Sequence, residues 1–184
     1  ESALSAEARD VIDTQIEQRL GYSLQQVDRL LPRLRLGVDS GRVETLRVID
    51  GYSLMLDNII KVFSGMVIVN DLEIFEQGRA LISVGNARAF MLREDALVTA
   101  ALANGGKFKP AEHLAFIQSV AMGQREMAAG MNDLNSDLRG PLERLQASEG
   151  YKNFRAMETA ITSSPDARIP AQAANWQATT PRLS

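Results

Sequence analysis

Apolar residues recur at intervals of three and four along most of the chain, and no segment shows the strict alternation typical of a half-buried strand. The first such stretch covers about residues 6–31 and is followed by Pro32, which we expect to end or kink the helix. Its apolar stripe consists of Ile12, Ile16, Leu20, Leu24, Val27 and Leu31.

Turn residues at positions 37–41 separate this helix from a second one, which Asp39 or Ser40 can cap. The core stripe of the second helix consists of Leu46, Ile49, Leu56, Ile59, Ile60, Phe63 and Val67. A third helix is predicted over residues 72–103, and the paired glycines Gly105 and Gly106 close it, because glycine tolerates the left-handed conformation of a helix terminus.

The rest of the chain predicts a fourth long helix, followed by shorter elements. A fourth helix covers about residues 111–138, after Pro110 in its first turn, and Gly140-Pro141 interrupts it. A fifth segment covers residues 142–161 with a possible break at Gly150, and a short last helix follows Pro170 and carries Trp176 and Leu183. The tryptophan is expected in the core, with a membrane interface as the alternative.

Helices joined by short turns usually pack antiparallel, so the fold class predicted is all-α, an antiparallel up-and-down helical bundle with four long helices. We expect a single domain over residues 1–184, with the core bundle at about 6–138 and shorter C-terminal helices at about 141–183. An even number of segments would bring both chain ends to the same end of the bundle.

The amino-acid composition excludes several kinds of partner and site. The formal net charge of −3 comes from interspersed acids and bases without a basic run, so we expect no nucleic-acid partner. The chain has no cysteine and one histidine, His113, which we expect at the solvated surface. Neither a metal site nor a Ser/His/Asp arrangement can be built from these residues. We therefore predict no catalytic residue, no metal and no cofactor.

Two faces of the third helix can carry chemistry. One is rich in small residues, which favour either tight packing against a neighbouring helix or a ligand crevice lined by backbone: Phe75, Gly78, Ile82, Gly85, Ala89, Leu92, Ala96, Thr99 and Ala103. The other places Arg88 and Asp95 two turns apart among apolar neighbours. A partly buried guanidinium there would pair with Asp95 or Asp57, or would bind an exchangeable anion.

The stretch from Arg93 to Gly105, followed by Lys107-Phe108 and Pro110-Ala111-Glu112-His113, resembles the nitrate- and nitrite-sensing type of ectodomain. Three further stretches resemble the same group. They are Val38-Asp39-Ser40-Gly41-Arg42 before a helix containing Gly51-Tyr52, Ile169-Pro170-Ala171, and Trp176 at the start of the last helix.

This resemblance implies an extracytoplasmic sensor domain between two transmembrane helices of an actinobacterial sensor histidine kinase, or of a conservon-encoded, kinase-like membrane protein of Streptomyces. It implies a small anion or another extracellular ligand, and signalling across a membrane implies a homodimer. The candidate ligand-binding residues are Arg88, Arg93 and Arg19, the last in a loose match to the acid-Arg pattern of the first helix. Many members of the group resemble one another in having Glu or Gln followed by Arg at this place, whereas this chain has Glu94-Asp95. An acidic residue in place of the arginine argues against nitrate as the ligand.

Two other functions fit the same pattern. One is a receptor module that binds another protein, which a large exposed apolar patch would favour over an enclosed polar crevice. The other is a cytoplasmic helical adaptor bundle, which hydrophobic spans of about 20 residues on both sides of the domain would rule out.

Overall fold

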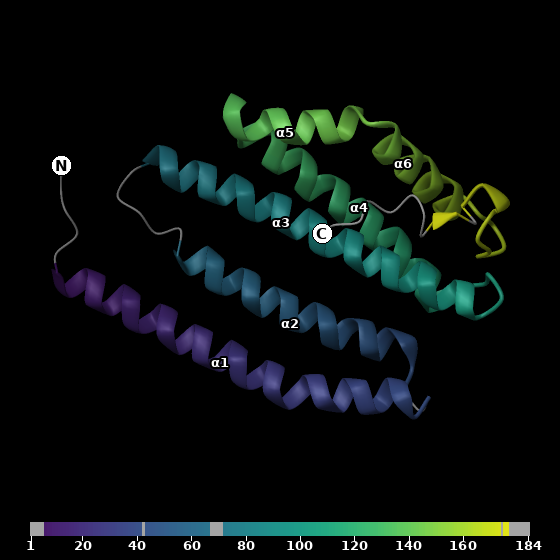
Figure 1. Ribbon diagram of the computed structural model, residues 1–184, viewed down its shortest axis with the longest axis horizontal. Coiled ribbons are helices and arrows are strands. Elements are labelled where there is room, and N and C mark those ends of the chain that lie inside the picture. The colour runs from purple at the N-terminus through teal and green to yellow at the C-terminus, as the bar shows by residue number, and fades with distance from the viewer. Residues whose placement is uncertain (1–5, 42, 67–71, 174, 177–184) are drawn as a thin grey trace.

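The computed structural model describes residues 6–41, 43–66, 72–173 and 175–176. Arg42, Val67 and Leu183, which the sequence analysis placed in motifs or stripes, lie outside these residues. The described part consists of six α-helices and one short 3-10 helix (Figure 1). The elements are α1 (Ala6–Asp39), α2 (Thr45–Met66), α3 (Leu72–Ala103), α4 (Pro110–Asp133), α5 (Ser136–Ala147), α6 (Glu149–Thr162) and η1 (Ala171–Ala173).

The four longest helices are antiparallel, and each packs against the next one in chain order (Figure 1). The all-α bundle predicted from the sequence is thus confirmed. α5 and α6 then follow one another in the same direction, with α6 against α4. This departs from the strict alternation of direction that the even-number argument assumed, and the two chain ends themselves lie outside the described residues. The described chain ends at Trp176, which is hydrogen-bonded to Asp95 of α3.

Neither proline ends a helix. α1 continues through Pro32 to Asp39, so of the two outcomes expected at Pro32 the end of the helix is wrong, and neither Asp39 nor Ser40 caps α2. Likewise, Pro141 lies inside α5 and does not separate two helices. Both prolines are exposed, and a solvent-facing carbonyl that loses its helical N–H partner can bond to water.

The breaks between α4, α5 and α6 lie at polar caps. Asn135 accepts a hydrogen bond from the backbone N–H of Leu138 (3.1 Å), so α4 ends at Asp133 and not at residue 138. Ser148 accepts one from the N–H of Tyr151 (3.2 Å), which places the second break two residues before Gly150.

The end of α3 follows the prediction. Gly105 and Gly106 have φ values of 70° and 76°, and the Gly106 N–H donates to the carbonyl of Ala101 at 2.9 Å. The loop after α3 then pairs with the loop after α6, because the N–H of Phe108 donates to the carbonyl of Ala167 (2.9 Å). These bonds fasten the C-terminal segment to the α3–α4 corner.

The core lies between α3, α4 and α6. Its largest fully buried side chains include Trp176, Phe108, Phe116 and Phe154. The ring of Trp176 lies 5.0 Å from that of Phe154 and 6.0 Å from that of Phe116, measured between centroids. The expectation that Trp176 belongs to the core is confirmed. None of the helices in the described ranges is both long and apolar enough to cross a bilayer.

Candidate functional site

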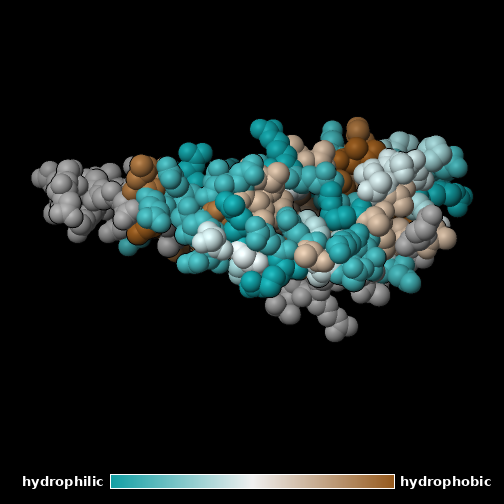
Figure 2. Space-filling model, turned by 90° about the horizontal axis from the view of Figure 1, so that it is seen from above, coloured by the Kyte–Doolittle hydropathy of each residue, from teal (hydrophilic) through white to brown (hydrophobic). Residues whose placement is uncertain are grey.

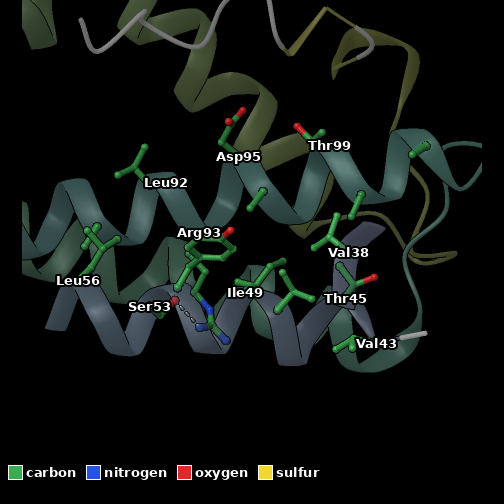
Figure 3. A pocket seen from close by; sticks show the side chains of 16 residues that line it. Val38, Val43, Thr45, Ile49, Ser53, Leu56, Leu92, Arg93, Asp95 and Thr99 are labelled. Atoms are coloured by element: carbon green, nitrogen blue, oxygen red, sulfur yellow. Dashed lines mark hydrogen bonds between the residues drawn. The ribbon is translucent and has the colours of Figure 1, made fainter. Parts of the chain in front are cut away.

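The small-residue face of α3 borders a groove. Figure 3 shows this groove, a cavity of about 570 Å³ between α2, α3 and the corner that joins α1 to α2. Most of its lining is aliphatic, and Ala89, Leu92, Ala96, Thr99 and Ala103 come from the predicted face. The C-terminal half of this face therefore borders an open groove, whereas Phe75, Gly78, Ile82 and Gly85 do not line it. The tight packing is on the opposite side of α3, where Ala80 and Ala87 approach glycines of α4.

Arg93 extends from α3 towards α2 along the edge of this groove (Figure 3). Its Nη1 donates to Oγ of Ser53 at 3.0 Å, and its Nη2 lies 2.6 Å from Oδ1 of Asp50. The Arg93 side chain is 22% exposed and that of Asp50 is 59% exposed. The guanidinium thus already has a carboxylate partner, and it connects α3 to α2.

The structure does not place Arg88 in a partly buried site. Its side chain is exposed on α3 and does not line the groove. Asp95 instead accepts a hydrogen bond from Nε1 of Trp176 at 2.9 Å, across 81 residues of sequence. The side chain of Glu94 is buried on the other side of α3 and is 1% exposed.

A second, polar pocket of about 710 Å³ lies between α1 and α2 and contains the third candidate, Arg19. Every lining residue has a polar side chain, and none is acidic: Gln18, Arg19, Tyr22, Ser23, Asn58, Lys61 and Ser64. Within the described part of the chain, neither Arg19 nor Lys61 has a carboxylate at ion-pair distance. The pocket therefore combines two cations with neutral hydrogen-bonding groups.

Gly65 allows the guanidinium of Arg19 to lie against α2. A methyl group added at Gly65 would lie 3.0 Å from Nη1 of Arg19. One turn further along α1, the buried Ser23 donates from Oγ to the carbonyl of Arg19 at 2.9 Å. The absence of a side chain at residue 65 thus positions the charge of Arg19 over the helix that also carries Lys61.

Sequence reasoning identified Arg19 but missed Lys61 and Asn58. The spacing of these two residues, three positions apart on α2, places them on one helix face. Gln18 and Tyr22 are four positions apart on α1, so they also lie on one face of their helix. That signal becomes useful only when the register of the antiparallel pair α1–α2 is known.

His113 is half-buried, which corrects the expectation of a solvated histidine. Its Nε2 lies 2.9 Å from the carbonyl oxygen of Ile161, and its ring lies 5.6 Å from that of Phe108 between centroids. Because a carbonyl oxygen can only accept a hydrogen bond, Nε2 of His113 carries the hydrogen and donates it. The residue therefore joins α4 to the end of α6 and has a structural role.

In helical bundles, ligand sites are built from side chains on facing helices, as the residues of this pocket are placed. The family model for nitrate and nitrite sensing matches residues 2–183. The chain therefore belongs to the nitrate and nitrite sensing family, and it is a sensory input domain. Neither the curated proteins nor the solved structures contain a significant match to it.

Proposed function

We propose that the chain is the extracytoplasmic input domain of a membrane-bound sensor histidine kinase, or of a kinase-like membrane protein, and that it binds a small oxyanion between α1 and α2. The observation that carries the binding proposal is the pocket that holds Arg19 and Lys61 without a lining carboxylate. Membership in the nitrate and nitrite sensing family makes nitrate and nitrite the first anions to test.

The chemistry of the pocket supports an oxyanion. The planar fork of an arginine matches the oxygen atoms of a small oxyanion, and lysine adds a compact charge. Amide and hydroxyl groups of Asn58 and Tyr22 can donate further hydrogen bonds. Glu94 and Asp95 do not line this pocket, so they are no obstacle to an anion there.

The position of the pocket suggests how binding would be transmitted. α1 packs chiefly against α2, and the pocket places a cation on each of these helices. Without an anion the two charges repel one another, whereas a bound anion attracts both. An anion then binds better to the arrangement in which α1 and α2 are close, and it shifts α1 towards that arrangement.

The test is thermal unfolding in sodium nitrate or sodium nitrite against sodium chloride at equal ionic strength. At one hundred times its dissociation constant, a ligand adds about 2.7 kcal/mol of stability. For a domain of this size that corresponds to roughly 5–10 °C in Tm. We expect the shift in the unaltered protein, and its loss in Arg19→Gln and in Lys61→Gln.

Arg88→Gln is the matched control, because Arg88 is an exposed arginine on α3 and does not line this pocket. It should keep the full shift. Binding in the α2–α3 groove would instead be indicated if Arg93→Gln abolished the shift and Arg19→Gln did not. A protein without any nitrate, nitrite or other oxyanion response would contradict the proposal.

We also propose that a second copy of the chain covers the α1–α2 pair. This pair exposes several large apolar side chains, which are Leu20, Leu24, Leu36, Val38, Tyr52, Leu54, Ile59 and Phe63. In contrast, Figure 2 shows a mainly hydrophilic face with small, separate hydrophobic patches on the side of α5 and α6. Half of the large apolar side chains that are exposed in the described residues lie on these two helices, and exposed apolar surface favours a partner there.

Light scattering after size-exclusion chromatography tests the dimer. We expect a mass of two chains for the unaltered domain and of one chain for the double variant Leu24→Ser/Phe63→Ser. Leu145→Ser, an exposed leucine of α5, should leave the dimer intact. A monomeric unaltered domain at 100 µM would contradict this proposal.

The membrane context has its own test. The full-length protein should fractionate with membranes, and a protease added outside the cell should cleave this domain. Recovery of the full-length protein in the soluble cytosolic fraction would favour the cytoplasmic adaptor instead.

A further inference from the structure

Two glutamates from distant parts of the sequence meet inside the molecule. Glu94 of α3 and Glu158 of α6 are each only 1% exposed. Their side chains are close enough for a hydrogen bond between the two carboxyl groups. Gly123 of α4 makes room for them, because a methyl group there would lie 3.5 Å from Oε1 of Glu94. Three helices therefore enclose the pair.

The charges around this pair do not balance if both acids are ionised. Arg155 of α6 donates from Nη1 to Oε2 of Glu158, and it is the cation that faces the pair. The other groups that face it are neutral at pH 7, namely Gln124 of α4 and Tyr151 of α6. Two buried carboxylates with one guanidinium would leave a buried negative charge without compensation.

The unsatisfied atoms show where a proton belongs. Among the described residues, Oε2 of Glu94 and Oε1 of Glu158 are buried and have no donor. A carboxylate can only accept hydrogen bonds, whereas a protonated carboxyl group also donates one. One proton between the two side chains supplies the missing donor and removes the excess charge at the same time.

We propose that Glu94 and Glu158 share one proton, and that this proton holds α6 and the segment ending at Trp176 against α3. The docking of the C-terminal part of the domain on the bundle is then sensitive to pH. The same joint contains the hydrogen bond from Trp176 to Asp95, one residue after Glu94. Loss of the proton weakens the contact between α3 and α6, because two adjacent carboxylates repel each other.

The electrostatic environment assigns the proton to Glu94. Burial, followed by the charge of Glu158, raises the pKa of Glu94 to about 10. Burial also raises the pKa of Glu158, but the hydrogen bond from Glu94 and the guanidinium of Arg155 act in the opposite direction. Glu94 is therefore the neutral donor, and Glu158 is the carboxylate that pairs with Arg155.

The sign of the pH effect follows from the raised pKa. The unfolded chain loses the Glu94 proton near the ordinary value of 4.5, whereas the folded protein keeps it up to about pH 10. Between these values the folded state binds one more proton than the unfolded state, so stability falls as pH rises. The unfolding equilibrium constant should increase by up to tenfold for each pH unit.

The experiment is urea unfolding of the whole domain at pH 6, 7, 8 and 9, followed by the fluorescence of Trp176, the one tryptophan of the chain. We expect the tenfold increase per pH unit in the unaltered protein and little change in Glu94→Gln, whose amide donates to Glu158 without titrating. Glu143→Gln removes an exposed glutamate of α5 and should keep the steep dependence.

An equally steep dependence in Glu94→Gln would overturn the proposal. If that variant does not fold, calorimetric unfolding of the unaltered protein in buffers of different ionisation enthalpy decides the question. Release of about one proton per molecule on unfolding at pH 7.5 supports the shared proton. Release of none overturns it.

Discussion

The α3–α4–α6 part of the molecule and the α1–α2 pair differ in the interactions that stabilise them. The first contains the buried aromatic side chains, the contacts at Gly123 and Gly130, and the Glu94–Glu158 pair. The second has few fully buried side chains, exposes large apolar residues and has an open pocket between its helices, lined by residues with polar side chains. Low local stability is common in elements that bind ligands and move. The comparison suggests that one part keeps the fold while the other responds.

The join between the two parts is narrow. α2 contacts α3, and Arg93 connects them through Asp50 and Ser53 beside an open groove. A change in the α1–α2 pair can therefore occur while α3 and α4 keep their packing. Variants that act on one part and not on the other test this division.

The largest expected effect is at the aromatic core. Trp176→Ala removes a fully buried ring that packs on Phe154 and Phe116, and it should lower the free energy of unfolding by about 3–5 kcal/mol. Arg29→Ala, at an exposed residue of α1 outside the proposed contact surface, should change it by less than about 0.5 kcal/mol. Urea unfolding followed by circular dichroism measures both. Similar losses in the two variants would contradict the division.

Two glycines should respond to alanine with opposite signs. A methyl group at Gly130 would lie 2.8 Å from the carbonyl oxygen of Ala80, so Gly130→Ala should cost about 1–3 kcal/mol by forcing α3 and α4 apart. Gly85 lies in α3 with nothing within 4 Å of such a group. Gly85→Ala should therefore stabilise the protein by about 0.5–1 kcal/mol. Thermal unfolding distinguishes the signs, and two destabilising results would refute this description of α3.

The smallest effect on global stability is expected at Pro32. Pro32→Ala restores a backbone donor inside α1. The free energy of local opening in α1 should rise by about 1 kcal/mol or more, so its amide hydrogens should exchange more slowly. The exchange rates in α3 and α4 should not change. Equal slowing in all helices would mean that α1 opens only with the whole molecule.

Helix ends can be predicted from the sequence where residues at the end itself determine them. The C-terminal end of α3 is predicted correctly because Gly105 and Gly106 adopt the positive φ that a helix terminus requires. Pro32 and Pro141 misled the prediction, since proline is tolerated within a helix where the freed carbonyl faces solvent. The caps at Asn135 and Ser148 were local signals that a stricter search for capping residues could have found.

The site depends on contacts that no local pattern contains. In the sequence Glu94 and Asp95 form one dipeptide of the motif, yet the partner of Glu94 is Glu158 and the partner of Asp95 is Trp176. Arg19 was chosen from a weak motif, but the residues that complete its pocket come from α2. The apolar residues on the same helix face predict a partly buried Arg88, but the packing of α3 leaves it exposed. The register of the helices decides each of these pairings.

Hydrogen exchange of the domain with and without nitrate tests the central claim most directly, because it locates the bound anion. We predict slower exchange on nitrate addition in two stretches, residues 18–23 of α1 and 58–64 of α2, and no such change in Arg19→Gln. Slower exchange confined to the groove between α2 and α3, or the same response in Arg19→Gln as in the unaltered protein, would contradict the account.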